Sequence, residues 1–154
     1  MEKQVKFFDI EAEQIVLGML IFNNDYLKQV SDYISIQHFC SHSHKKIYNY
    51  ILNPKHNETL KDFFENEIDI KISGGFDYLE KLLKMSAGII DIRDYLKLIK
   101  ELSFRRNLLI YCEEIKDLLY KGADAETIIK MIEEGYDEIK EKGYFTKRDY
   151  QRVY

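Results

Sequence analysis

The 154-residue chain is predicted to be all-α, with a compact multi-helix head followed by a long antiparallel helical hairpin. Three observations predict this class. Apolar residues recur at steps of three, four or seven along most of the chain, which is the spacing of a helix face. A single proline and seven glycines leave few helix breakers. No segment shows the pattern of a sheet strand.

The head is assigned to residues 1–90, and its first helix is expected to be central. Asp9 is a candidate N-cap for this helix, because a short polar side chain can accept from the first backbone N–H groups. The apolar residues that follow are too numerous for one narrow stripe, so the helix should be mostly buried. The polar break at residues 23–25 then begins a second helix, whose apolar residues are Tyr26, Leu27, Val30, Tyr33 and Ile34.

Three further helical segments complete the predicted head. One runs over about residues 43–52 and ends at Asn53-Pro54, because proline disfavours helical geometry at the residue before it. Residues 59–66 form a short amphipathic piece. Gly74-Gly75 then introduces a helix that carries Phe76, Tyr78, Leu79, Leu82 and Leu83.

The hairpin is assigned to residues 91–142. No glycine or proline interrupts the apolar spacing from Ile92 to Tyr120, so one helix of roughly 40 Å is predicted. Residues 121–124 end this helix and cap a second one, which should end near Gly143. Two helices cannot bury both apolar stripes against each other, so the hairpin should also pack on the head or on another chain. Self-association is therefore a hypothesis.

Residues 143–154, GYFTKRDYQRVY, are predicted to be the start of a linker or tail. Four aromatic residues and local positive charge leave a contact with single-stranded nucleic acid open as an alternative.

Composition bounds the cellular setting. Cys40 and Cys112 show no paired spacing, which favours a reducing compartment. The longest apolar run, residues 15–22, is far shorter than the roughly 20 residues that span a bilayer, and the first residues lack a signal-peptide pattern. We therefore expect a cytoplasmic protein with no membrane partner. A net charge of −4, with acidic and basic residues interleaved, predicts little or no direct nucleic-acid binding.

The segment HFCSHSH, residues 38–44, holds three of the four histidines and one of the two cysteines, which raises the question of a metal site. As a strand it would span about 20 Å, too far for one ion. As a helix, its pairs His38/His42 and Cys40/His44 would face opposite sides, and each pair would need further ligands from elsewhere. No metal-binding residues are predicted. An enzyme with a helical metal site stays open only if the purified protein contains stoichiometric zinc.

No catalytic or cofactor-binding residues are predicted. The carboxylate pairs Glu11/Glu13 and Glu133/Glu134 lie in helical patterns that explain them as solvent-facing charge or as first-turn charge complementing the helix dipole. The chain has no GxxxxGK[ST] motif and no Gly-Lys dipeptide, so it should not hydrolyse ATP. This chain is therefore not expected to be an enzyme.

Four segments in order carry a resemblance to a known family. They are DIEAEQIVLGML (Asp9 to Leu20), HFCSHSHKKIY (His38 to Tyr48), GGFDYLEKL (Gly74 to Leu82) and DIRDYLKLIKELSFRRNLL (Asp91 to Leu109). Together they resemble the amino-terminal domain of DnaB-type replicative DNA helicases over about residues 7–140. The resemblance implies an all-α head followed by a helical hairpin. It also implies that Phe39 enters the core and that His44 begins a helix.

The resemblance implies a role without chemistry. In that family a separate carboxy-terminal ATPase domain is the motor and uses ATP and Mg²⁺, while the amino-terminal domain pairs hairpins into dimers, arranges three dimers in a collar around DNA and docks the primase. Partners implied here are a second copy of the chain, a primase and, as a further candidate, a helicase loader. The alternative is a stand-alone collar-like protein that binds, loads or inhibits a helicase ring.

The expected assembly and partner interface is the hairpin. Its predicted residues are Ile99, Leu102, Arg105, Arg106, Leu109, Ile128, Ile132 and Tyr136. For the two arginines, salt bridging along the helix face is the alternative to a contact with a partner.

Overall fold

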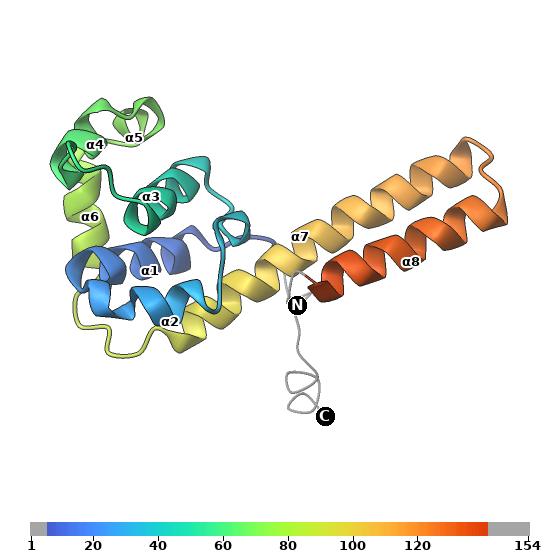
Figure 1. Ribbon diagram of the computed structural model, residues 1–154, viewed down its shortest axis with the longest axis horizontal. Coiled ribbons are helices and arrows are strands. Elements are labelled where there is room, and N and C mark those ends of the chain that lie inside the picture. Colours follow the sequence, from blue (N-terminus) through green and yellow to red (C-terminus); the bar gives the residue numbers. More distant parts are fainter. Residues whose placement is uncertain (1–5, 142–154) are drawn as a thin grey trace, which may run out of the picture. The chain divides into compact units, whose positions relative to one another are not determined.

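A computed structural model describes the backbone of residues 6–141 and the side chains of residues 6–139. The predicted all-α class is confirmed, because the described residues form helices and turns and no strand (Figure 1). The chain divides into two compact units, Met1–Ser103 and Phe104–Tyr154. From here on these units are called the head and the hairpin. Their boundary lies inside the long helix, so residues 91–103, which the sequence analysis assigned to the hairpin, belong to the head.

Helix α1, Ile10–Phe22, is the central helix of the head (Figure 1). Asp9 is its N-cap as predicted, with Oδ1 accepting from Ala12 N at 3.0 Å. Every residue from 12 to 20 is buried. A Cβ added at Gly18 would overlap the backbone carbonyl of Leu82, so glycine allows α1 to lie directly against α6, Phe76–Ser86.

Short elements connect α1 to α6 and follow the predicted breaks with two additions. They are η1 (Asn24–Tyr26), α2 (Leu27–Ser31), η2 (Ile36–His38), α3 (His42–Leu52), α4 (Leu60–Asn66) and α5 (Ile68–Ile72). The second helix is shorter than its apolar pattern suggests, and η2 and α5 were not predicted. The helix α3 ends at the residue before Asn53-Pro54, as expected. Gly74 and Gly75 have φ of 123° and 58°, a left-handed turn that L-residues rarely adopt, immediately before α6.

Aromatic and aliphatic side chains fill one core in the head. The largest fully buried side chains are Tyr48, Phe39, Phe64, Leu17, Leu20, Ile34, Ile47, Ile70, Leu82, Ile92, Ile99 and Leu102. The rings of Phe39 and Tyr48 lie 4.9 Å apart, and the Tyr48 hydroxyl donates to the Ile34 carbonyl at 3.1 Å. Burial raises the pKa of Tyr48 to about 12.

The hairpin contains the end of α7, Arg93–Tyr120, and α8, Ala125–Glu141. At 1.5 Å per residue the 28 residues of α7 span about 42 Å, which confirms the single long helix. Gly122 forms the turn with φ of 76°, and the Asp124 carboxylate accepts from Thr127 N at 2.8 Å to cap α8. The expected helix end near Gly143 and the predicted tail lie outside the described residues. No described helix is both long and apolar enough to span a membrane.

Candidate functional site

A buried polar cluster joins α1 to the start of α3. The Glu13 carboxylate is 2% exposed and accepts three hydrogen bonds. Oε1 accepts from Cys40 N at 2.5 Å, and Oε2 accepts from Ser41 N at 3.3 Å and lies 2.6 Å from His44 Nδ1. Of the two explanations expected for Glu13, solvent exposure is wrong, because these distant groups satisfy its charge inside the head. The other is confirmed, because Glu13 lies in the first turn of α1. Glu11, its partner in the predicted pair, is exposed.

The cluster continues from His44 to α6. His44 Nε2 lies 2.6 Å from the Tyr78 hydroxyl, which accepts from Gln14 Nε2 at 3.0 Å. Because the Glu13 carboxylate only accepts, Nδ1 carries the imidazole proton; Nε2 then accepts from the Tyr78 hydroxyl. Burial raises the pKa of Tyr78, which keeps that hydroxyl protonated. Each of these donors therefore meets an acceptor.

This cluster, Glu13, Gln14, His44 and Tyr78, positions helices. All four residues are buried, so no substrate reaches them in this structure. The residues come from the first three of the four segments that carry the family resemblance, and their hydrogen bonds hold those segments together. The cluster therefore has a structural role. Removing one of its partners would leave a charged group buried without compensation, which lowers the stability of the fold by several kcal/mol.

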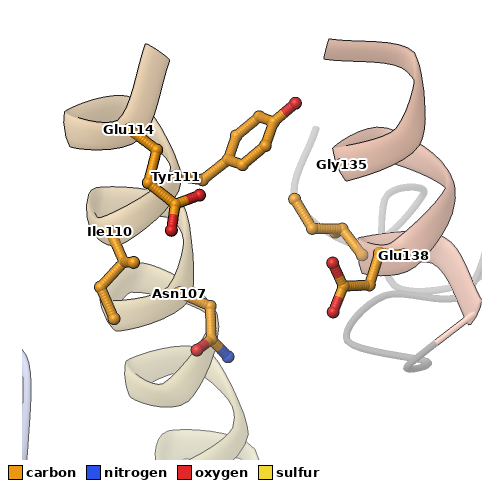
Figure 2. A pocket seen from close by; sticks show the side chains of 7 residues that line it. Asn107, Ile110, Tyr111, Glu114, Gly135 and Glu138 are labelled. Atoms are coloured by element: carbon orange, nitrogen blue, oxygen red, sulfur yellow. The ribbon is translucent and has the colours of Figure 1, made fainter. Parts of the chain in front are cut away.

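In the hairpin, α7 and α8 meet at Tyr111 and Gly135. The Tyr111 ring lies directly on Gly135, where an added Cβ would overlap ring atoms, and its hydroxyl donates to the Met131 carbonyl. Figure 2 shows Tyr111 extending from α7 toward α8. Among the described hairpin residues, Gly135 alone is buried.

A shallow pocket lies between the two hairpin helices next to this contact (Figure 2). It has a volume of about 200 Å³ and is lined by Asn107, Ile110, Tyr111, Glu114, Gly135, Glu138 and Ile139. Apolar groups and two carboxylates share its wall, which suits a side chain of a protein partner better than a nucleotide, whose phosphates the carboxylates would repel.

Large apolar side chains of the hairpin are exposed. On α8, Ile129, Ile132 and Tyr136 follow one another at steps of three and four and are 55%, 47% and 64% exposed. We call these three residues the α8 stripe. On α7 the exposed apolar residues of the hairpin are Leu108, Leu109, Ile110, Leu119 and Tyr120. Exposed apolar residues at this density are typical of a surface that another protein covers.

Comparison with known proteins decides the family. Residues 5–101 match the sequence model described as the DnaB-like helicase N terminal domain. The chain belongs to this family. It is similar to proteins named replicative DNA helicase DnaB from Rickettsia typhi (33% identical), Rickettsia prowazekii (34%) and Buchnera aphidicola (28%). These similarities cover 81%, 81% and 88% of this chain.

The family match covers nearly the whole head. The family match ends at residue 101, close to the end of the head at Ser103. The similarity to the Rickettsia helicases covers 81% of the chain, which is more than the head alone. The chain spans only 26%, 27% and 31% of the lengths of these three relatives. The resemblance inferred from the four sequence segments is therefore confirmed for this DnaB-like domain.

Four residues of the HFCSHSH segment in the DnaB-like domain have separate local roles. Phe39 is buried in the core and His44 lies in the first turn of α3, so both expectations for this segment are confirmed. His38 Nδ1 accepts from Ser35 N at 2.7 Å, and the exposed His42 lies 3.4 Å from an Asp69 carboxylate oxygen. Over the described residues, no group of three or more His, Cys, Asp or Glu side chains could hold a metal ion.

The structure separates the predicted interface residues. Ile99 and Leu102 are each 2% exposed in the head, so they are not available to a partner in this conformation. Leu109, Ile132 and Tyr136 are exposed in the hairpin, whereas Ile128 is partly buried. Arg105 is exposed and Arg106 partly buried, and both make interactions within the chain.

Two contacts of the DnaB-like domain were missed from the sequence. The Tyr111 contact had a signal, because a glycine inside an amphipathic helix often marks a close approach by another group. The cluster around Glu13 had only a weak sequence signal, since the residues that it joins by hydrogen bonds lie up to 64 positions apart.

Proposed function

We propose that the chain is a non-catalytic collar and protein-docking domain of a cytoplasmic replicative DNA helicase. It pairs hairpins into dimers, contributes those dimers to a ring and docks a primase, with a helicase loader as a further partner. ATP and Mg²⁺ belong to a separate motor domain. The family membership supports the helicase context.

The α8 stripe is the observation that carries the proposal. Many apolar side chains of the head fill a core, whereas no described apolar side chain of α8 is fully buried, and Ile129, Ile132 and Tyr136 are exposed along one side of this helix. Covering apolar surface stabilises an association by about 25 cal/mol per Å² before the costs of binding are subtracted. A second hairpin supplies the same exposed apolar residues of α8.

Replacing Ile132 by aspartate tests the pairing. We expect sedimentation equilibrium to show a concentration-dependent dimer of the unaltered chain, and Ile132→Asp to weaken it about tenfold or more, because the buried carboxylate would have no partner. The matched control is Ile90→Asp, since Ile90 is a 90% exposed residue of the head. A strictly monomeric unaltered chain at high micromolar concentration would contradict hairpin pairing.

Primase docking has its own measurement. The carboxy-terminal helicase-binding domain of the cognate primase should bind the chain saturably in calorimetry, with a Kd on the order of micromolar for a transient contact. The chain alone should neither hydrolyse ATP nor unwind DNA. Binding to an intact helicase ring without binding to primase would favour the stand-alone collar-like protein instead.

A further inference from the structure

The end of the head formed by α4 and α5 has an unusual balance of charge (Figure 1). We call residues 58–77 the acidic lobe. It contains six carboxylates and two lysines, a net charge of −4 that equals the formal net charge of the whole chain. The carboxylates are Glu58, Asp62, Glu65, Glu67, Asp69 and Asp77. The rest of the chain is therefore neutral overall, and the acidic lobe carries its excess negative charge.

Two isoleucines of the acidic lobe point outward. Ile68 is 67% exposed and Ile72 is 82% exposed, whereas Ile70 between them is fully buried. On a helix, residues four apart lie about 40° from each other and residues two apart about 200° from each other. Ile68 and Ile72 therefore form one apolar face of α5, and Ile70 fixes the opposite face in the core.

An ion-pair group also anchors α5. The Lys46 ammonium of α3 lies 2.5 Å from an Asp69 carboxylate oxygen and also pairs with Glu67. Lys46 offsets one of the lobe's negative charges, and Lys55, whose ammonium lies 3.3 Å from a Glu58 carboxylate oxygen, offsets a second, so four negative charges become two and the lobe stays acidic. Since Ile70 and these ion pairs hold α5 on both sides, a partner would meet Ile68 and Ile72 in a fixed position, which lowers the entropy lost on binding.

We propose that the acidic lobe is a docking surface for a basic amphipathic helix of a partner protein. The apolar stripe of that helix covers Ile68 and Ile72, and its flanking Lys or Arg side chains lie near the exposed carboxylates of Glu65 and Asp77. Charge complementarity selects this occupant. A second acidic lobe, a nucleic acid or an anionic membrane would bring negative charge against negative charge.

This docking surface is independent of hairpin pairing. It lies wholly in the head, and it uses α5 in place of the α8 stripe. Opposite charges at the lobe should speed encounter with a basic partner at low salt, and the acceleration should fall as the screening length shortens.

A designed peptide provides the probe. We would use a helical peptide of about four turns, with leucines on one face and lysines on the other, and a twin in which glutamates replace the lysines. Fluorescence anisotropy with the full chain should show saturable binding of the lysine peptide, weakened several-fold when salt is raised to about 0.3 M, and little binding of the glutamate twin. Equal binding of the two peptides would overturn the proposal.

Substitutions locate the binding to the acidic lobe. The pair Ile68→Ser and Ile72→Ser should weaken binding of the lysine peptide about tenfold, while the control Ile90→Ser should change it less than about twofold. Glu65→Lys should weaken binding a few-fold, and Glu126→Lys on the hairpin should not. An unchanged Kd in the isoleucine double variant would contradict the proposal.

Two measurements keep the test separate from folding and from hairpin pairing. Circular dichroism should show an unchanged helix content, because the substituted side chains are exposed. If the double variant nevertheless fails to fold, Glu65→Lys alone decides the outcome. Sedimentation should show the same dimerisation in every lobe variant, so failure of the docking proposal and failure of hairpin pairing give different results.

Discussion

In the head, α1, α3 and α6 bury apolar side chains in one core and are tied together through Glu13, His44 and Tyr78. In the hairpin, α7 and α8 meet where Tyr111 lies on Gly135, and most of their large apolar residues are exposed. The head thus has a core of its own, with buried hydrogen bonds that arrange its helices, although Ile68, Ile72 and some other apolar residues stay exposed. In the described part of the hairpin no large apolar side chain is buried, which is the basis for proposing that another molecule covers them.

This difference separates the residues expected to determine the stability of the head from those expected to determine assembly. A substitution inside the head should lower the free energy of unfolding without acting directly on pairing, whereas one on the α8 stripe should weaken pairing and leave the head folded. Residues far apart with no shared partners usually contribute additively, so the two effects should be separable.

The largest effect is expected for Glu13→Gln. Glutamine cannot reproduce the three hydrogen bonds that the buried carboxylate accepts, and it brings an NH₂ group against their donors. We expect the free energy of unfolding of the head to fall by about 3 kcal/mol, measured by denaturant titration with circular dichroism.

The neighbouring Glu11→Gln is the matched control for that variant. Glu11 lies in the same first turn of α1 but is exposed, so its loss should change stability by no more than about 0.5 kcal/mol. Equal stabilities for the two variants would mean that the Glu13 cluster does not hold the head together.

Local signals explain what the sequence could predict. Asp9 caps α1 through a side chain three residues from its donor, and the absence of glycine or proline from residues 93–120 was enough to predict one continuous α7.

Long-range packing explains what the sequence did not reveal. Glu13 looked like a surface residue because the groups that satisfy it lie 27 to 31 residues away. The alternating isoleucines of α5 lack a helical period, and Ile70 and Lys46 fix that helix through tertiary contacts. The spacing of apolar residues along α7 does not change at Ser103, where the head ends. The sequence pattern therefore could not show that Ile99 and Leu102 are buried in the head.

Alkaline pH should act next most strongly, and through the head. The folded-state pKa of Tyr48 is about 12, above the ordinary value of 10. Stability from this group is complete below about pH 10 and is lost as pH rises toward 12, because the unfolded chain releases the proton first. Between about pH 9 and pH 11 we expect a loss of about 1 kcal/mol from this group, measured by denaturant titration.

The variant Tyr48→Phe should reduce that pH dependence, although it also loses the hydrogen bond to the Ile34 carbonyl. Tyr78, whose pKa burial also raises, should maintain a loss in the same direction. Tyr120→Phe is the matched control, since Tyr120 is 85% exposed in the hairpin. An identical pH dependence in Tyr48→Phe and Tyr120→Phe would contradict the assignment of the effect to the core.

An effect of similar size, but confined to the hairpin, is expected for Gly135→Ala, and its sign tests the hairpin contact. In an open helix, alanine would stabilise α8 by about 1 kcal/mol relative to glycine. Here the added Cβ meets the Tyr111 ring, which must move and give up its hydrogen bond to the Met131 carbonyl. We therefore expect a local loss of about 1 kcal/mol, seen as faster hydrogen exchange of the α8 amides, with unfolding of the head unchanged.

Removing the ring should reverse the sign of that effect. In a Tyr111→Leu background the overlap is absent, so Gly135→Ala should slow hydrogen exchange in α8 through its higher helix propensity. The difference between the two backgrounds measures the coupling of Tyr111 to Gly135 directly. If alanine slowed exchange equally in both backgrounds, the two hairpin helices would not be held by this contact in solution.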